Sequence, residues 1–243
     1  MYSGQIFALL GHNGAGKTTT ISTLTGLLRP TGGQAQLDDV DILEDQDYLR
    51  KHLGVCPQHN VLFDYLSVRE HLQLYAAFKG VSKKEIGKKV DKMLYEVELV
   101  ENQYQLASTL SGGQKRKLSV AIALIGDAKI IMLDEPTSGM DTQTRRRFWE
   151  MVKQYKEGRI IILTTHYMDE ADILGDRICI MAEGNVQCCG SSLFLKNRFG
   201  AGYNLVLAKL PGTHVDCKAV TDYIKRRLPE ATKLQEVSTE ITF

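Results

Sequence analysis

Short apolar runs of strand length alternate along this chain with stretches whose apolar residues recur at helical spacing. Strands are expected at Ile6–Leu10, Gln34–Leu37, Leu53–Pro57, Ile130–Leu133 and Arg159–Thr164. Helices are expected at Thr18–Leu28, over the stretch that holds Leu118, Ala121, Ile122 and Ile125, and at Thr144–Lys156. Buried strands that alternate with helices predict an α/β fold with a mainly parallel, doubly wound sheet core.

Between Leu66 and about Leu106 the pattern becomes helical throughout. One apolar face runs from Val68 to Tyr75 and another from Ile86 to Val97. These two faces predict a helical insertion in the α/β core, a helical subdomain that covers about residues 59–126.

Two strands, Ile178–Met181 and Val186–Cys188, flank Glu183–Asn185 and form an expected hairpin. After Gly190 the pattern changes again, and Leu193–Phe199 is an expected short helix. A strand at Tyr203–Leu210, a helix at Val215–Leu228 and a last strand near Ile241 follow. We therefore predict a main domain over residues 1–190. Residues 191–243 would form a linker helix and the start of a small α+β appendage of β-α-β type.

A glycine-rich loop, Gly11–Thr18, separates the first expected strand from the first expected helix. It fits the G-x-x-x-x-G-K-[ST] phosphate-loop pattern, in which backbone N–H groups and a helix N-terminus surround a phosphate. Lys17 would contact the β- and γ-phosphates, and the Thr18 hydroxyl would bind Mg²⁺. The residues expected to hold the nucleotide here are Gly11, Asn13, Gly14, Ala15, Gly16, Lys17, Thr18 and Thr19.

Polar residues at the ends of the other strands are the expected partners of this loop. Asp134 and Glu135 follow the strand Ile130–Leu133, where ligands bind in open α/β sheets. Asp134 is suited to hold Mg²⁺ and Glu135 to polarise an attacking water. Gln58 could contact Mg²⁺ or that water, and His166 could bind the γ-phosphate or orient the water.

A second anion site is expected at Ser111, Gly112, Gly113 and Gln114, which begin another helix. A long helix separates this segment from the strand that carries Asp134, so we expect it to complete the nucleotide pocket of another subunit. A capped helix start, with glycines for close packing, is the alternative.

Composition narrows the class of protein. The formal net charge of the 243 residues is +1, so no basic field favours nucleic acid as a partner. No apolar run approaches the length of a membrane-spanning helix. The five cysteines form no C-x-x-C pair, which favours reduced thiols over a disulfide framework or zinc site. The basic clusters Lys115–Lys117, Arg145–Arg147 and Lys225–Arg227 are interpreted as solvated helix faces or ends.

Taken in order, these motifs resemble the nucleotide-binding domain of ATP-binding-cassette proteins, over about Gly4–Gly190. The matching motifs are the phosphate loop, the Q-loop at Gln58, the signature Leu110–Gln114, the Walker B segment Ile130–Glu135, the D-loop Ser138–Asp141 and the switch His166. The resemblance implies a head-to-tail dimer with two ATP molecules at its interface. Lys17, Thr18, Gln58, Asp134, Glu135 and His166 of one domain would face Ser111 and Gly113 of the other, with Asp141 nearby.

Further segments look like subfamily A, the lipid-handling full transporters, and most like the first of their two cassettes. They are Gly11–Gly14, Lys115–Ala121, Thr165–Asp172 and Leu193–Gly200. The resemblance implies transmembrane domains, a lipid substrate handled by them, and a second cassette in the same polypeptide. The domain would lie on the cytoplasmic face of a membrane. The family's adenine-stacking aromatic residue would precede this chain, which we interpret as a fragment.

Two other functions remain open at this point. A soluble cassette ATPase that acts on nucleic acid or ribosomes is one, although the neutral charge disfavours it. A regulatory cassette that binds ATP without hydrolysis is the other, although the presence of both Glu135 and His166 disfavours it.

Overall fold

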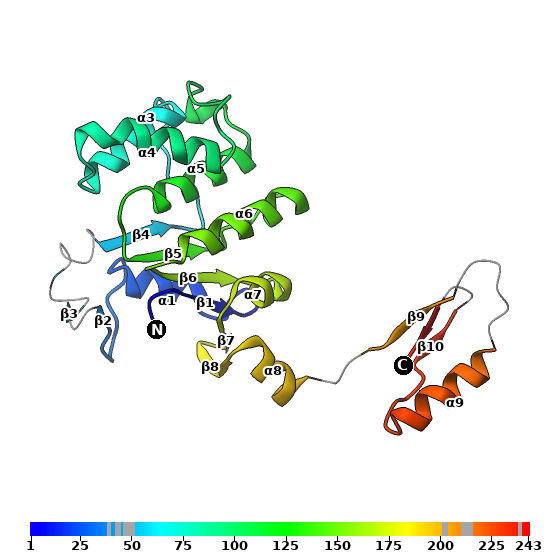
Figure 1. Cartoon of the computed structure of the whole chain (residues 1–243). Coiled ribbons are helices and arrows are strands. Elements are labelled where there is room, and N and C mark those ends of the chain that lie inside the picture. Colours follow the sequence, from blue (N-terminus) through cyan, green and yellow to red (C-terminus); the bar gives the residue numbers. More distant parts are fainter. Residues whose placement is uncertain (38–39, 42–44, 46–51, 201–203, 210–215, 238–239) are drawn as a thin grey trace. The chain divides into compact units, whose positions relative to one another are not determined.

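The computed structural model describes residues 1–37, 40–41, 45, 52–200, 204–209, 216–237 and 240–243 (Figure 1). The chain divides into two compact units, Met1–Leu195 and Lys196–Phe243. The domain boundary predicted after Gly190 stays a prediction.

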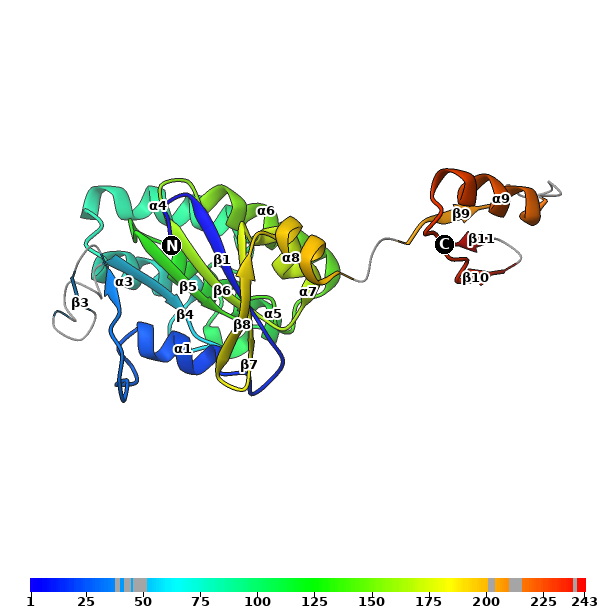
Figure 2. The ribbon, with the colours of Figure 1, turned by 90° about the horizontal axis from the view of Figure 1, so that it is seen from below.

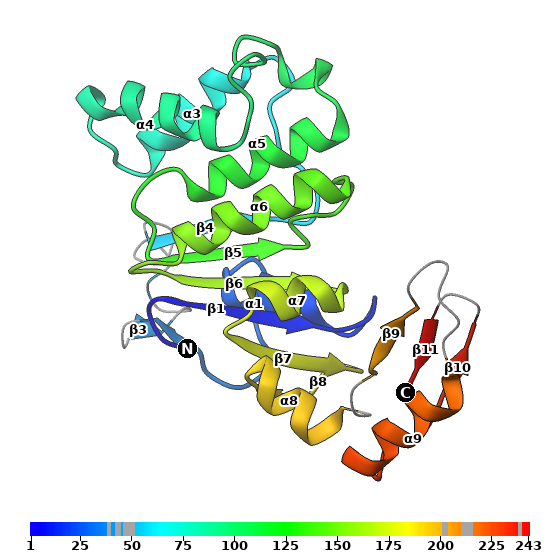
Figure 3. The same cartoon turned by 45° about the vertical axis from the view of Figure 1, so that its right-hand side comes forward.

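The core of the first unit is a six-stranded sheet in the order β4-β5-β6-β1-β7-β8, which Figure 3 shows strand by strand. Its strands are β1 Gln5–Leu10, β4 Leu53–Cys56, β5 Ile130–Asp134, β6 Ile160–Thr165, β7 Arg177–Ala182 and β8 Asn185–Gly190. All neighbours are parallel except β7 and β8, which form the expected hairpin. The predicted α/β class with a mainly parallel sheet is confirmed.

Helices cover both faces of this sheet (Figure 2). They are α1 Lys17–Leu24 on one face and, on the other, α5 Gly112–Leu124, α6 Thr142–Tyr155 and α7 Met168–Leu174. Alternate strand residues supply the two cores. Ile131 and Leu133 pack with α5 and α6, whereas Ile130 and Met132 pack with Ile21 of α1. This division follows from the two-residue period of a strand that is buried on both faces.

Two further helices, α3 Val68–Phe78 and α4 Lys83–Glu96, pack on one another beside α5, where the helical insertion was predicted. A short 3₁₀ helix, η1 Ala107–Thr109, ends this region. Helix α3 begins with a capping box, in which the Ser67 side chain accepts from the amide of Glu70 and the Glu70 carboxylate accepts from the amide of Ser67. The apolar faces predicted for both helices are buried, at Val68, Leu72, Val90 and Met93 among others.

The first helix is shorter than predicted. Helix α1 ends at Leu24 rather than Leu28, because Gly26 adopts a left-handed conformation with φ 75°. Leu27 and Leu28 are consequently exposed and lie on no buried helix face. Spacing alone could not locate this end, because Leu28 falls in register with Leu24 on the helical period.

After α1, two short strands, β2 Gln36–Leu37 and β3 Val40–Asp41, form an antiparallel pair. Helix α8 Ser192–Phe199, the predicted short helix, follows β8 along the chain. Among the described residues, we find no helix that is both long enough and apolar enough to cross a bilayer.

The second unit has a three-stranded antiparallel sheet in the order β10-β11-β9 and one helix. Its elements are β9 Val206–Ala208, α9 Cys217–Arg227, β10 Gln235–Glu236 and β11 Glu240–Thr242. The α+β character of the appendage was predicted, but β10 was missed because its two residues are both polar and exposed. The ends of the predicted strand Tyr203–Leu210 and the start of the predicted helix at Val215 lie outside the described residues.

Candidate functional site

The loop Gly11–Gly16 joins the carboxyl end of β1 to the first turn of α1. Gly14 and Gly16 have φ values of 83° and 100°, which suit glycine and turn the backbone around the start of the helix. Lys17 is the first residue of α1 and only 4% exposed. Its ammonium nitrogen donates to the carbonyl oxygens of Gly11, at 2.9 Å, and of His12, at 3.2 Å.

The β7–β8 hairpin supports this loop from the side. A Cβ on Gly11 would lie 2.5 Å from the carbonyl oxygen of Met181, so only glycine fits there. At the hairpin turn, the amide of Gly184 donates to the carbonyl of Ala15 at 3.1 Å. Ala15 is fully buried as a result.

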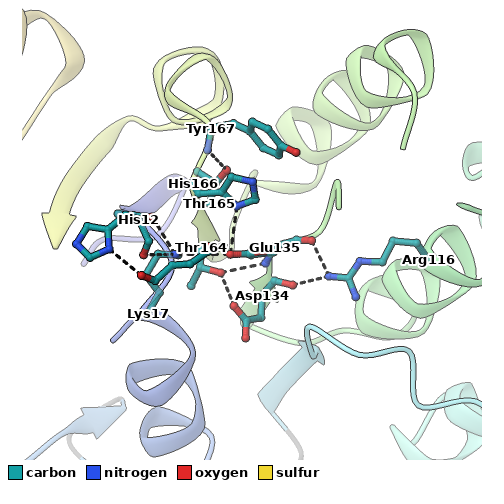
Figure 4. A network of polar contacts seen from close by, with 11 residues as sticks. His12, Lys17, Arg116, Asp134, Glu135, Thr164, Thr165, His166 and Tyr167 are labelled. Atoms are coloured by element: carbon teal, nitrogen blue, oxygen red, sulfur yellow. Dashed lines mark hydrogen bonds and ion pairs between the residues drawn. The ribbon is translucent and has the colours of Figure 1, made fainter. Parts of the chain in front are cut away.

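Asp134 and Glu135 occupy the carboxyl end of β5, beside the loop (Figure 4). The Glu135 oxygen Oε1 lies 3.6 Å from the ammonium nitrogen of Lys17 and 3.3 Å from Nδ1 of His166. Glu135 also has a positive φ of 47°, an unusual conformation for a residue with a side chain. The structure therefore brings two of the predicted residues, Lys17 and His166, to the carboxylate of a third, Glu135.

Thr164 was not anticipated from the sequence. Its hydroxyl donates to Oδ1 of Asp134 and accepts from the amide of Glu135, the latter at 3.0 Å (Figure 4). Asp134 and Thr164 are register partners on neighbouring parallel strands. The sequence offered one indication of this role, because Thr164 ends a predicted strand. It did not indicate which strand adjoins β5, so the contact with Asp134 could not be predicted.

The other predicted residues of this edge are more open. Asn13, Thr18 and Thr19 are exposed on the loop and the first turn of α1, a helix that packs beside β5. Gln58 is exposed two residues beyond β4, the strand next to β5. Gln58 therefore lies just beyond the carboxyl end of β4, and Asp134 lies at the carboxyl end of the adjacent parallel strand β5, at the same edge of the sheet.

The signature segment forms a capping box at the start of α5. The Ser111 hydroxyl accepts from the amide of Gln114 at 3.3 Å, and the Gln114 amide oxygen accepts from the amide of Ser111 at 2.9 Å. Ser111 and Gly112 are exposed, and the Cβ position of Gly113 is 4.0 Å from the carbonyl of Gly139. The capped helix start, one of the two interpretations of this segment, is thus present, and it leaves the helix N-terminus open.

Asp141 also has a structural role in this chain. Its carboxylate caps α6 by accepting from the amides of Gln143 and Thr144, both at 3.0 Å. A further hydrogen bond from the Thr144 hydroxyl, together with these amides, lowers the pKa of Asp141 below its usual range. The carboxylate is therefore held ionised and oriented at the N-terminus of α6.

The interpretation of the basic clusters as solvated is wrong for Arg116 on α5, whereas Arg146 and Arg147 on α6 are exposed as expected. Arg116 is 2% exposed and donates to backbone carbonyl groups around the site. Lys117 and Arg147 both pair with Glu98, and the Arg145 guanidinium lies 4.2 Å from the centre of the Tyr167 ring. Packing of α5 against β4 and β5 explains the burial of Arg116, because it encloses a side chain that a single helix would leave in water. The third cluster, Lys225–Arg227 on α9, is exposed as expected.

Comparison with known proteins identifies the family of this chain. The sequence profile of the family described as "ABC transporter" matches residues 1–138. The chain belongs to this family. The resemblance to its ATP-binding cassettes is confirmed, and the chain is an ABC-type ATPase domain.

Full-length relatives agree with the predicted subfamily. The human protein "Phospholipid-transporting ATPase ABCA3" is 50% identical over 243 residues, which are 100% of this chain and 14% of that protein. The Dictyostelium discoideum "ABC transporter A family member 2" is 49% identical over 245 residues, with 100% of this chain and 15% of that protein covered. The chain thus spans about a seventh of the length of these relatives.

A solved structure agrees with the fold. The "ATP-binding cassette MJ0796 bound to ADP and Pi", a dimer in a post-hydrolysis state, superposes with a TM-score of 0.72 at 27% identity. The alignment covers 79% of this chain and 87% of that one. A "Structure of ATP binding subunit of ABC transporter" covers 94% of this chain with a TM-score of 0.76, also at 27% identity.

Proposed function

We propose that this domain binds and hydrolyses ATP with Mg²⁺, and that hydrolysis drives lipid transport by a membrane protein of which it is the cytoplasmic motor. The observation that carries the hydrolytic part is the convergence of Lys17 and His166 on the carboxylate of Glu135. A phosphate ligand, a general base and a polar residue to orient water are the groups that phosphoryl transfer to water requires.

The loop fits a triphosphate. Its left-handed glycines, Gly14 and Gly16, bring backbone N–H groups and the N-terminus of α1 to one concavity. The ammonium group of Lys17 is held at that point by the loop's own carbonyl groups. The loop residues from Gly11 to Thr19 would bind the phosphates through their backbone N–H groups, and Lys17 would neutralise charge on the β- and γ-phosphates.

The residues next to the loop fit Mg²⁺. The Thr18 hydroxyl, the Asp134 carboxylate and the Gln58 amide supply hard oxygen donors, which this cation prefers. Asp134 is 2% exposed, and its carboxylate is oriented by the hydroxyl of Thr164. The bound cation would neutralise charge on the phosphate oxygens, while these three residues fix its place relative to the loop.

Glu135 would act as the general base for the attacking water. The ammonium group of Lys17 and the imidazole of His166 both contact its carboxylate and orient it toward the loop. His166, 32% exposed in its side chain, would orient the water or the γ-phosphate from the side of β6. Gln58 would contact the water or Mg²⁺ from the side of β4.

A second cassette is proposed to complete the site. Ser111, Gly112, Gly113 and Gln114 of that domain would contact the nucleotide bound here, and Asp141 would lie near the interface. The open N-terminus of α5 supports this arrangement, since it presents backbone N–H groups at the surface. A related cassette has been solved as a dimer.

Lipid is proposed as the transported substrate because relatives that match the whole chain are named phospholipid-transporting ATPases. The partners would then be transmembrane domains and a second cassette of the same polypeptide. These names do not favour a soluble cassette that acts on nucleic acid, the first alternative left open by the sequence.

Mg²⁺-dependent ATP turnover by the 243-residue chain, measured over a series of protein concentrations, tests the proposal. We expect turnover to rise faster than linearly with protein and to be lost in Glu135→Gln. Glu157→Gln, an exposed substitution of the same type, serves as the control that keeps wild-type turnover. Equal turnover in Glu135→Gln and wild type would refute the role of Glu135, and ATP binding without any turnover would favour the non-hydrolysing alternative.

A further inference from the structure

Arg116 is a buried cation that donates to five backbone carbonyl oxygens and, at 3.5 Å, to the side-chain oxygen Oδ1 of Asn60. It lies on the second turn of α5 and is 2% exposed. Its Nη1 donates to the carbonyls of Pro57, at 2.6 Å, and Gln58, at 3.1 Å. Its Nη2 donates to the carbonyls of Asp134 and Glu135, the latter at 2.9 Å (Figure 4). Its Nε donates to the carbonyl of Pro136 at 3.1 Å.

These carbonyls belong to two separate segments that both carry proposed catalytic groups. Pro57 and Gln58 follow β4, whereas Asp134–Pro136 end β5 and begin the next loop. One planar guanidinium group therefore ties the Gln58 segment to the Glu135 segment. The fixed fork of five N–H donors suits arginine to this task, because lysine has three donors at a single point.

Glu135 is the residue that most needs such support. Its φ of 47° lies in the left-handed region, which is strained for a non-glycine residue and persists only when its surroundings fix it. The Glu135 backbone is held on both sides, since its amide donates to Thr164 and its carbonyl accepts from Arg116. This conformation is the one in which the carboxylate meets Lys17 and His166.

Helix α5 extends the connection to the signature segment. Its first residues form the capping box of Ser111 and Gln114, and Arg116 follows on the same continuous helix. A rigid element thus links the open helix N-terminus to the two segments behind it. Lys117, the next residue, instead pairs with Glu98 and takes no part in this link.

We propose that Arg116 is a positioning residue that sets the Gln58 and Glu135 segments relative to the signature helix α5. It acts through backbone carbonyls and does not touch the nucleotide. This inference rests on the proposed function, because positioning matters for turnover only if Glu135 and Gln58 serve hydrolysis.

The test compares wild type with Arg116→Met, Arg116→Lys and Val90→Ala in the 243-residue chain. Val90 is fully buried in α4, so Val90→Ala controls for a loss of stability away from the site. Misplacement of a catalytic group by about 1 Å costs up to about 100-fold in rate. For Arg116→Met we therefore expect kcat per folded molecule to fall about 10- to 100-fold, while the affinity for ATP stays within about threefold, since Arg116 does not contact the phosphate loop.

Hydrogen–deuterium exchange without nucleotide provides a readout that does not need turnover. We expect faster exchange in peptides that contain residues 57–60 and 134–138 of Arg116→Met, and not in those of Val90→Ala. Arg116→Lys should lie between wild type and Arg116→Met in both measurements, and it carries the test if Arg116→Met fails to fold.

The outcomes separate the inference from the function on which it rests. Unchanged exchange in both segments, or a kcat equal to that of wild type, would overturn the role of Arg116. A fall in turnover that only follows the folded fraction, as in Val90→Ala, would overturn it too. Local exchange changes in a chain whose wild type shows no turnover would support the positioning by Arg116 and refute the proposed hydrolysis.

Discussion

The Nδ1 atom of His166 lies 3.3 Å from the carboxylate oxygen Oε1 of Glu135. The two residues follow neighbouring parallel strands, β6 and β5, whose register aligns Asp134 with Thr164. A strand-end histidine and a strand-end glutamate therefore meet because of the sheet order, although 30 positions separate the register partners along the chain. Under the proposed function, this pair would lie where water approaches the γ-phosphate of a nucleotide on the loop.

We expect His166→Ala to lower ATP turnover by about 100-fold, because removal of a positioned proton-transfer or orienting group costs on the order of 10²–10⁴ in rate. ATP binding should change by no more than a few-fold, since the phosphate loop keeps Lys17 and its glycines. Steady-state turnover and equilibrium binding of a fluorescent ATP analogue measure the two quantities. Turnover that stays within twofold of wild type would show that His166 is only a structural neighbour of Glu135.

Glu135→Gln should bind ATP more tightly than wild type. The Glu135 carboxylate lies 3.6 Å from the Lys17 ammonium group and competes with phosphate oxygens for that charge. Removal of a negative charge from a site that receives phosphates should raise affinity by about tenfold, equivalent to about 1.4 kcal/mol. Equilibrium binding at protein concentrations too low for association isolates this effect.

Glu157→Gln is the control for this prediction, because it removes the same charge at an exposed position. Its affinity for ATP should equal that of wild type. An unchanged or weaker affinity in Glu135→Gln would mean that the Lys17–Glu135 contact does not limit phosphate binding.

The phosphate loop could be predicted from the sequence because its chemistry is local. Strand, glycine loop, lysine and helix start are contiguous, so spacing alone fixes their relation. Thr164 and Arg116 are different, since each acts through a contact between elements that are distant in sequence. Arg116 carries a charge that usually lies in solvent, and only the packing of α5 against β4 and β5 encloses it. The strand β10 could not be predicted because its two residues are polar and exposed, and they therefore show no apolar pattern.

Gly11→Ala should damage the loop. Its Cβ would lie 2.5 Å from the Met181 carbonyl oxygen and 2.9 Å from the Ala15 side chain, so backbone must move. We expect a loss of about 1–3 kcal/mol in the free energy of unfolding, as for other overpacked positions, and weaker ATP binding. Urea unfolding and equilibrium nucleotide binding measure both effects.

Gly87→Ala is the matched control for this substitution. Gly87 lies within α4 with nothing within 4 Å of its Cβ position, so alanine should stabilise the protein by about 0.5–1 kcal/mol. If Gly11→Ala proved as stable as wild type, the hairpin β7–β8 would be able to move away from the loop and make room for the added Cβ.

Lys79 links the helical insertion to the core and should make stability depend on pH. Its ammonium group donates to the carbonyls of Ile122 and Ala123, both at 2.8 Å, at the end of α5. Burial lowers the pKa of Lys79 to about 8, below the 10.5 of an ordinary lysine. Between these two values the unfolded chain holds the proton and the folded chain does not, so the stability contributed by this group grows as the pH rises.

We therefore expect the stability of wild type relative to Lys79→Met to increase by about 2 kcal/mol between pH 7 and pH 9.5, at about 1.4 kcal/mol per pH unit above the folded pKa. Urea unfolding at the two pH values measures the difference, and the comparison of the two chains cancels all other titrating groups. Lys92→Met, at an exposed position on α4, is the control and should show no such growth. A gap between wild type and Lys79→Met that stays constant would mean that Lys79 keeps its proton in the fold. The bonds to the carbonyl groups of α5 would then outweigh the cost of burial.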